Sequence, residues 1–231
     1  MRILGLQKIS LIDYPGKVCS VIFLSKCNFR CGYCHNPELV FDIDLPEIKE
    51  EEVMKVLDER KGFIDGVCIT GGEPTLHKEL PDLIRKIRGL GFKVKLDTNG
   101  SNPKMLQDLI EKRLVDFIAM DVKNVFERYE ETTNSKVSTE VIKESIKTII
   151  SSGIEHEFRT TVLPKFHKKE DIVEIAKDYL KGAKKYVLQQ FMPSEKMLDK
   201  SLLTEKRFSE KDLKTLREEC NKYINTEIRN L

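Results

Sequence analysis

The sequence of 231 residues has little of three things: long apolar runs, excess charge of one sign, and an N-terminal targeting segment. No run of about 18 apolar residues occurs, so we expect no membrane-spanning segment. The 40 basic and 38 acidic residues leave a net charge of only +2, so we expect neither nucleic acid nor a membrane surface as a partner. The first apolar stretch is short and is interrupted by Lys8 and Asp13, so we expect no signal peptide and a cytoplasmic protein.

Linkers, fixed-period repeats and low-complexity tracts are also missing, and hydrophobic residues make up 40% of the chain. That share is enough to fill a core. We therefore expect residues 1–231 to form a single domain, with its core at about 17–190 and a C-terminal helix at about 209–223. Six cysteines in a reducing compartment are not expected to form a disulfide framework. Three are clustered and three are scattered, which is typical of a metal site accompanied by structural thiols.

Strand-like and helix-like segments alternate along the whole chain. Apolar segments predict strands at residues 18–24, 66–70, 93–97, 115–122, 155–163 and 185–190. Helix start and stop signals predict helices at residues 47–60, 80–90, 103–112, 138–153, 168–180 and 209–223. Short connections favour parallel strands, so we predict an α/β fold, a partial (β/α)6 TIM-like barrel of parallel strands with outer helices. An open doubly wound sheet is the competing architecture, and the polar segment 124–136 is expected to be a flexible loop.

Three cysteines, Cys27, Cys31 and Cys34, lie within eight residues, in a loop directly after the first predicted strand. Thiolates are ligands of iron–sulfur clusters and of zinc. A structural zinc ion takes four protein ligands, and His35 is badly placed to complete such a set because it adjoins Cys34. A zinc knuckle or three buried thiols is the alternative, but the polar residues of this loop pack poorly in a core. The spacing therefore indicates a metal centre with one open position, as a catalytic centre requires.

The C-x3-C-x2-C spacing, with the aromatic Tyr33 before the last cysteine, resembles that of the radical S-adenosylmethionine (SAM) superfamily. The longer strings Asp-Tyr-Pro-Gly-Lys at 13–17 and Cys-Asn-Phe-Arg-Cys-Gly-Tyr-Cys-His-Asn-Pro at 27–37 resemble the activating enzymes of glycyl-radical proteins. Within that group the chain most resembles the anaerobic ribonucleoside-triphosphate reductase activating proteins and, more distantly, the pyruvate formate-lyase activating enzyme. The resemblance is densest over residues 7–40, and weaker matches continue to about residue 190.

The resemblance implies that Cys27, Cys31 and Cys34 hold three irons of a [4Fe-4S] cluster, and that the fourth iron binds the amino and carboxylate groups of SAM. One electron from the reduced cluster then breaks a carbon–sulfur bond of SAM and gives methionine and a 5'-deoxyadenosyl radical. That radical takes a hydrogen atom from a glycine Cα of a partner protein, a glycyl-radical enzyme. The electron donor implied by the resemblance is a flavodoxin or a ferredoxin-type protein.

Gly71, Gly72, Glu73 and Pro74 follow the second predicted strand, at the carboxyl edge where barrels of parallel strands carry their sites. Glycines let a backbone approach a ligand closely, and a glutamate beside them is able to accept hydrogen bonds from an ammonium group. Alone, this string predicts an ordinary turn. Beside the cysteine loop it resembles the Gly-Gly-Glu-Pro motif of the superfamily, which implies that these residues bind SAM.

Two further strand ends carry polar residues: Asp97, Thr98 and Asn99 after the third predicted strand, and Asp121 and Lys123 after the fourth. Both segments resemble strand-end motifs of the formate-lyase activator. The resemblance implies that the aspartates help to hold a monovalent cation near the SAM carboxylate, and that the lysine reaches the active site as a catalytic candidate. The alternatives from the residues alone are an Asx turn at the first segment and a solvated lysine at the second.

Four more residues are candidate contacts of SAM. Arg159, on the fifth predicted strand, is able to pair with the SAM carboxylate if it points inward, and otherwise forms an outward salt bridge. Gln190, beside Gln189 near the end of the sixth strand, is the candidate contact of the adenine or ribose. Side chains alternate along a strand, so only one of these two glutamines faces the site. Tyr33 and His35 are expected to flank the adenine, as the equivalent positions of the family do.

No second cysteine cluster occurs in the sequence, which argues against additional iron–sulfur centres. Three functions stay open. The first is a glycyl-radical activating enzyme, and the second is a radical SAM enzyme that acts on a small molecule, similar to 7-carboxy-7-deazaguanine synthase. The third is a non-catalytic zinc or iron–sulfur binding module. The strings at 13–17 and 34–37 favour the first function.

Overall fold

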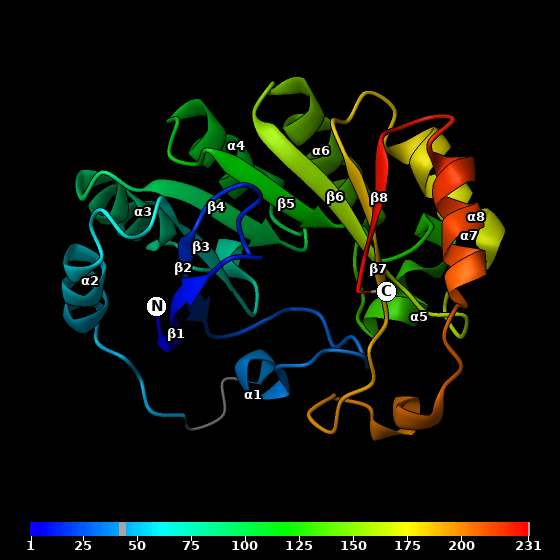
Figure 1. Ribbon diagram of the computed structural model, residues 1–231, viewed down its shortest axis with the longest axis horizontal. Helices are drawn as coiled ribbons and strands as arrows, with labels where there is room; N and C mark the ends of the chain where they lie inside the picture. The colour runs from blue at the N-terminus through cyan, green and yellow to red at the C-terminus, as the bar shows by residue number, and fades with distance from the viewer. Residues whose placement is uncertain (42–44, 231) are drawn as a thin grey trace.

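The computed structural model describes residues 1–41 and 45–230. Its centre is one sheet of eight strands, whose spatial order is their order along the chain (Figure 1). The strands are β1(Ile3–Ser10), β2(Cys19–Leu24), β3(Gly66–Gly71), β4(Lys93–Thr98), β5(Phe117–Asp121), β6(Glu155–Val162), β7(Tyr186–Gln190) and β8(Thr226–Arg229).

Strand β1 pairs with β2 in the antiparallel sense, and each pairing from β2 to β8 is parallel. Within the described residues, no strand pairing joins β1 to β8, so the sheet stays open. A doubly wound sheet reverses its strand order at a switch point, and this order never reverses. The predicted partial barrel is therefore confirmed for the six strands β2 to β7, and the doubly wound alternative is wrong.

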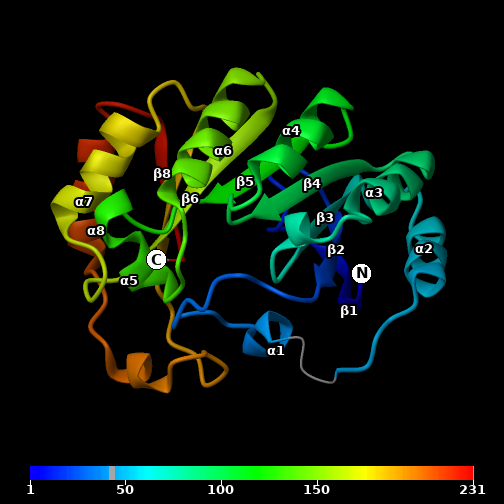
Figure 2. The same cartoon turned by 180° about the vertical axis from the view of Figure 1, so that it is seen from behind.

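Helices α3, α4 and α6 lie on one side of the sheet, behind it in Figure 1 and in front of it in Figure 2. The α-helices are α1(Pro37–Val40), α2(Glu50–Glu59), α3(Leu80–Gly89), α4(Pro103–Glu111), α5(Tyr129–Thr133), α6(Thr139–Ser151), α7(Lys169–Glu174) and α8(Glu210–Cys220). Three short 3-10 turns, η1(Pro74–Leu76), η2(Phe126–Arg128) and η4(Lys200–Thr204), and one π-helical turn, η3(Ile175–Tyr179), complete the elements. Among the described helices, none has the length and apolarity that a membrane span requires.

Helix α3 shows how the apolar pattern builds the core between helices and sheet. Leu80, Leu83, Ile84 and Ile87 recur at the helical period and are all buried. Full burial of one such side chain contributes about 1.5–3 kcal/mol. The helix ends two residues before Gly91, whose φ of +94° lies in the region that glycine adopts most readily. Period and stop signal together explain why the predicted bounds of this helix lie close to the observed ones.

The segment 124–136 is not the flexible loop that its polar composition predicts. It forms η2 and α5, and Tyr129 at the start of α5 is fully buried. The Asn124 side chain is also buried, and its amide nitrogen donates to the Thr132 hydroxyl and to the Phe166 carbonyl, both at 2.8 Å. Polar side chains here hydrogen-bond to one another inside the protein, which composition alone does not reveal.

Candidate active site

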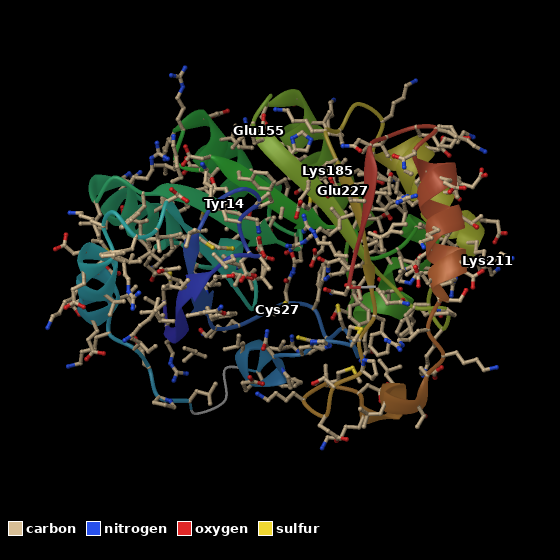
Figure 3. The ribbon with its side chains drawn as sticks, viewed as in Figure 1. Tyr14, Cys27, Glu155, Lys185, Lys211 and Glu227 are labelled. Carbon is tan, nitrogen blue, oxygen red and sulfur yellow. The ribbon has the colours of Figure 1, made fainter. Side chains whose placement is uncertain are left out.

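A cavity of about 160 Å³ lies at the carboxyl ends of strands β2 to β6. Figure 3 shows Cys27 at this end of the sheet, with Glu155 and Lys185 at the opposite end. Parallel strands bring their carboxyl ends to one edge, so residues that are far apart in the sequence meet there. Most predicted site residues line the cavity: Cys27, Cys31, Tyr33, Cys34, Gly71, Gly72, Glu73, Asp97, Thr98, Asn99, Asp121, Lys123 and Arg159. Three residues that were not predicted, Phe29, Val40 and Thr70, line it too.

The loop after β2 presents the three cysteines to this cavity. Its turns are tight, since the Cys34 N–H donates to the Cys31 carbonyl at 3.0 Å and the Phe29 N–H donates to Cys27 Sγ at 3.4 Å. The Arg30 guanidinium supports the loop by donating to the Cys27 carbonyl at 2.5 Å. Hydrogen bonds within the loop therefore fix the backbone of the cysteines before any metal binds.

Burial raises the pKa of all three thiols, to about 12 for Cys27. The thiols are therefore protonated at neutral pH, and a metal centre must displace their protons. Within the residues that the structure describes, no three His, Cys, Asp or Glu side chains are gathered closely enough to hold one metal ion. Cys27, Cys31 and Cys34 nevertheless line one shared cavity, and thiolates are the ligands of iron–sulfur clusters.

A segment after β7, residues 192–204, lies against the cysteine loop, and we call it the strap. The Leu198 N–H donates to the Cys34 carbonyl at 3.1 Å, and the Asp199 N–H donates to the Gly32 carbonyl at 2.8 Å. A Cβ at Gly32 would lie 3.1 Å from the Asp199 Cβ, so the loop and the strap approach closely. The sequence does not predict the strap, because main-chain hydrogen bonds carry no side-chain signature.

Gly71 and Gly72 bring the end of β3 against the end of β2. A Cβ on Gly71 would lie 2.3 Å from the Leu24 nitrogen, and one on Gly72 would lie 1.9 Å from the Lys26 carbonyl oxygen. The φ of Gly71 is +120°, which disfavours any other residue. The Glu73 N–H donates to the Lys26 carbonyl at 2.6 Å. Only glycines allow this approach, which sets the turn directly beside the cysteine loop.

Glu73 lines the cavity, but its carboxylate is fully buried and accepts hydrogen bonds from the chain itself. Oε1 accepts from the Thr75 N–H at 3.0 Å and from the Thr98 hydroxyl at 2.8 Å, and Oε2 accepts from the Asn99 N–H at 2.6 Å. Burial raises the pKa of Glu73, and these hydrogen bonds oppose the rise. The contact with a SAM ammonium group stays a prediction; the role visible in the structure is a tie between the ends of β3 and β4.

Five charged side chains form a continuous row, in the order Lys95, Asp97, Arg159, Asp121 and Lys123, and all of them except Lys95 line the cavity. Arg159 pairs with both aspartates: its Nη1 lies 3.1 Å from Asp97 Oδ2, and its Nε lies 2.7 Å from Asp121 Oδ1. The Lys95 ammonium contacts Asp97 Oδ1, and Lys123 Nζ lies 2.8 Å from Asp121 Oδ2. We call these five residues the charged row. Of the two orientations left open for Arg159, the inward one is observed.

Three cations face two carboxylates in the charged row, so it carries a net charge of +1 when all five groups are ionised. Burial by itself raises the pKa of Asp97 and of Asp121. Arg159, together with Lys95 beside Asp97 and Lys123 beside Asp121, outweighs burial and holds both pKa values below their ordinary range. Such a row favours the carboxylate of a ligand. Each carboxylate oxygen already faces a side-chain cation, and the monovalent cation stays a prediction. Lys95 was missed, although it alternates onto the same face as Asp97.

Two predicted site residues lie outside the cavity lining. His35 is exposed, and its Nε2 lies 2.9 Å from the carbonyl oxygen of Met192, the first residue of the strap. Pro74 is buried in η1, where a proline suits the first position of the turn. His35 therefore contacts the strap, and Pro74 shapes the turn after Gly72.

Gln190 is the third residue outside the cavity, and the structure corrects this choice. The register pairs Gln189 with Thr161, on the face of the sheet that also carries Arg159. Gln190 lies on the other face, where its Nε2 donates to the Phe208 carbonyl at 2.6 Å. The alternation of the two glutamines was predicted, but the sequence alone did not say which of them faces inward.

Tyr33 lines the cavity and adds a polar atom that a ligand can engage. The residue is buried, and its hydroxyl has no hydrogen-bond partner among the described residues. Lys123 Nζ lies 5.8 Å from the centroid of its ring. A buried hydroxyl without a partner beside a cavity marks a place for a ligand group. Together with the cysteines, the glycine turn and the charged row, it makes a site that fits a cluster and SAM.

Comparisons with known proteins agree with this geometry. The family model of the Radical SAM superfamily matches residues 21–179. A Methanocaldococcus jannaschii protein provisionally named a glycyl-radical enzyme activating enzyme (MJ1227) is 37% identical over 229 residues, which are 97% of this chain and 93% of that protein. The pyruvate formate-lyase-activating enzyme of Clostridium pasteurianum is 31% identical over 129 residues, which are 54% of this chain and 53% of that protein.

Solved structures share the fold at low sequence identity. Streptococcus suis SuiB bound to S-adenosylmethionine has a TM-score of 0.71 and 16% identity, over 91% of this chain and 52% of that one. A domain of the pyruvate-formate lyase-activating enzyme of Bacteroides vulgatus has a TM-score of 0.57 and 18% identity, over 71% of this chain and 99% of that one. With the family match and the relative that spans nearly the whole chain, the assignment is clear. The chain belongs to the radical SAM superfamily and, within it, to the glycyl-radical enzyme activating enzymes.

Proposed function

We propose that this enzyme cleaves SAM at a [4Fe-4S] cluster and abstracts a hydrogen atom from a glycine Cα of a glycyl-radical enzyme, an anaerobic ribonucleotide reductase. The observation that carries the proposal is the meeting of the three cysteines with the strand-end residues of β3 to β6 in one cavity. The 37% identity to MJ1227 supports the activating role. The choice of the reductase rests on the resemblance of residues 13–17 and 27–37.

The roles of the residues follow from their places around the cavity. Cys27, Cys31 and Cys34 hold three irons and leave the fourth for SAM. When bound, the cluster supplies the electron that breaks a carbon–sulfur bond of SAM, giving methionine and a 5'-deoxyadenosyl radical. The charged row attracts the SAM carboxylate through Arg159 and Lys123. The Gly71–Gly72 turn brings its backbone to the cavity beside the cysteine loop, where a side chain on either glycine would collide with Leu24 or Lys26.

The open sheet supports a protein as the substrate. A closed barrel admits only ligands that enter through its ends, whereas this sheet is unpaired between β1 and β8. A flexible loop of a partner is able to reach the concave face from that side. For the electron, we propose a flavodoxin or a ferredoxin-type protein as the donor, as in the enzymes that the cysteine loop resembles.

The proposal is tested by electron paramagnetic resonance (EPR). The anaerobically reconstituted enzyme is reduced, mixed with SAM and an anaerobic ribonucleotide reductase, and frozen. We expect the doublet of a glycyl radical on the partner, and one 5'-deoxyadenosine for each radical formed. Glycyl radicals on another glycyl-radical enzyme but not on the reductase would correct the choice of partner. Turnover of a small molecule such as a 7-deazaguanine precursor, with no radical on any partner, would contradict the activating role.

Substitution of a cysteine tests the cluster assignment itself. Cys31→Ala removes one ligand, so we expect bound iron and SAM cleavage to fall to the background level. Cys220→Ala is the matched control, because this buried thiol lies on α8, outside the cavity lining, and approaches the Ile172 carbonyl at 3.8 Å. Its variant should keep the iron and the SAM cleavage of the parent. SAM cleavage that survives in Cys31→Ala would refute the assignment.

A further inference from the structure

Asn99 contacts the cysteine loop from a different strand. It lies directly after β4, is only 6% exposed, and its side-chain nitrogen Nδ2 lies 3.7 Å from Cys27 Sγ and 2.9 Å from Asn28 Oδ1. The amide orientation is defined, because Asn99 Oδ1 accepts the Ser101 N–H at 2.9 Å. The nitrogen is therefore the end of the amide that faces the Cys27 sulfur.

The backbone of Asn99 is fixed by Glu73. The Asn99 N–H donates to Glu73 Oε2 at 2.6 Å, and the Glu73 N–H donates to the Lys26 carbonyl at 2.6 Å, one residue before Cys27. Hydrogen bonds thus run from the cysteine loop to the end of β3, on to the end of β4, and back to the Cys27 sulfur. Because this ring is closed, the Asn99 side chain is positioned by two strands as well as by its own turn.

We infer that Asn99 is a positioning residue of the cluster, which donates a hydrogen bond to the Cys27 thiolate and raises the reduction potential of the cluster. Hydrogen bonds to cluster sulfurs are one of the factors that set this potential, because they stabilise the more negative, reduced state. The Phe29 N–H also donates to Cys27 Sγ, from within the loop itself. Asn99 adds a second donor, whose position depends on how the carboxyl ends of β2, β3 and β4 pack against one another.

This role differs from the direct contact with SAM that a place in the cavity lining suggests for Asn99. Its Oδ1 is engaged by Ser101, and its Nδ2 by Asn28 and Cys27. The inference rests on the proposed function only in taking Cys27 as a cluster ligand. It needs neither SAM nor a partner protein, so the two proposals fail in different experiments.

The test is a potentiometric titration of the reconstituted enzyme without SAM, followed by the EPR signal of the reduced cluster. Asn99→Asp keeps the shape of the side chain, removes the donor and adds negative charge. We expect the ratio of reduced to oxidised cluster at a fixed potential to fall about tenfold, which corresponds to about 59 mV for a one-electron couple. Asn99→Ala removes the donor without adding charge, and should shift the ratio about threefold in the same direction.

Ser101→Ala is the matched control. The Ser101 hydroxyl donates to the same Asn28 Oδ1 at 3.3 Å and has no hydrogen bond to a sulfur among the described residues. Its variant should keep the parent potential. Iron content and the melting temperature of the metal-free protein are measured for each variant. If Asn99→Asp does not hold a full cluster, Asn99→Ala decides the question. A variant with four irons per chain and an unshifted potential would overturn the inference.

Glu73→Gln tests the ring independently. The variant keeps the shape of the side chain, but its amide group loses one of the oxygens that accept from Thr98 and Asn99. Removing the Glu73 carboxylate charge from beside the cysteine loop by itself raises the potential, whereas displacing Asn99 lowers it, so the substitution is made in the parent and in Asn99→Ala. If Glu73 holds Asn99 against the sulfur, Glu73→Gln should raise the potential more in the Asn99→Ala background than in the parent. Equal shifts in the two backgrounds would show that Asn99 keeps its place without Glu73, and would remove Glu73 from the ring.

Discussion

The concave face of the sheet has two halves that share strands but differ in chemistry. Toward the amino ends of the parallel strands, Tyr14, Cys19, Val21 and Cys68 form a small buried cluster. Toward the carboxyl ends, the same face carries the charged row and the cavity. Apolar burial stabilises a fold by roughly 25 cal/mol per Å², whereas buried ion pairs often contribute little or cost stability. One half therefore stabilises the sheet, and the other is retained for its ligand.

The string at 13–17 belongs to the stabilising half, although it carries one of the family resemblances. It connects β1 to β2, and Tyr14 is 3% exposed with its ring centroid 5.9 Å from that of Phe117. A Cβ on Gly66 would lie 3.0 Å from the Tyr14 ring. Figure 3 shows Tyr14 well apart from Cys27. The string at 13–17 therefore contributes to the family resemblance through residues that pack in the core. The cysteine string contributes to it through residues that line the cavity.

The largest change is expected from the carboxyl-end half. Arg159→Met removes the central cation of the charged row and leaves two partly buried aspartates with one lysine each. Breaking a fully buried pair costs about 3–5 kcal/mol, and because each aspartate here keeps one cation, the loss should lie at about 3 kcal/mol or less. We expect the free energy of unfolding to fall by that amount, and the dissociation constant of SAM to rise at least about tenfold. Urea titration and equilibrium dialysis measure the two effects.

A second arginine on the same face provides the matched control. Arg229 on β8 holds the buried Glu157 by two hydrogen bonds of 2.7 and 2.6 Å, and neither residue lines the cavity. Arg229→Met should therefore destabilise the fold and leave the affinity for SAM unchanged. If both variants weaken SAM binding equally, the charged row has no specific role in the site.

The next largest change is expected from the amino-end half. Tyr14→Ala removes a buried aromatic ring from the cluster that includes Cys19 and Cys68. Truncation of such a ring costs about 3 kcal/mol. Because the ring lies away from the cavity, the folded variant should bind the parent amounts of iron and SAM. Urea titration of the metal-free protein measures the loss of unfolding free energy. Iron analysis after reconstitution, with equilibrium dialysis of SAM, measures the bound iron and SAM. A folded Tyr14→Ala protein that binds no iron would contradict this separation, because it would show that the amino-end half is also needed for metal binding.

The sequence was sufficient for the strands that cross the middle of the sheet and insufficient for its edges. Strand β2 is a nearly continuous apolar run, which is typical of a strand covered on both faces. Strand β1 mixes exposed and buried positions without alternation, and β8 has only four residues, so neither produced a recognisable pattern. Edge strands are specified by pairing with a neighbour, and that pairing is not visible in local sequence.

The site was predictable wherever it depends on strand ends. Gly71, Asp97 and Asp121 each lie at the carboxyl end of an apolar strand, and parallel pairing brings such ends together. The strap was not predictable, because it contacts the cysteine loop through its backbone. Gln190 was chosen in place of Gln189 because the register of β7 depends on its partner β6. The position of the strap and the direction of the two glutamines are set by tertiary contacts, which the local sequence pattern does not reveal.

The smallest predicted effect concerns acid stability, and it compares two carboxylates of the same cavity. The folded pKa of Asp121 lies below its ordinary value, although burial opposes this, because Arg159 and Lys123 favour the charged form. Its contribution to stability is therefore fully present above an unfolded pKa of about 3.9, and is lost as the pH falls through the folded value. Asp121→Asn should make the loss of stability below about pH 4 shallower, by up to about 1.4 kcal/mol per pH unit.

Glu73 should behave in the opposite way, since burial raises its pKa in the folded state. A raised pKa contributes stability that is fully present below an unfolded value of about 4.3 and is lost as the pH rises through the folded value. Glu73→Gln should therefore flatten the change of stability above about pH 4 and leave the acid limb in place. Urea titrations of the metal-free proteins between about pH 2.5 and 8 measure both slopes. Equal changes in the two variants would contradict the assigned environments, because a carboxylate held by four hydrogen-bond donors and one held by two cations would then respond alike to protons.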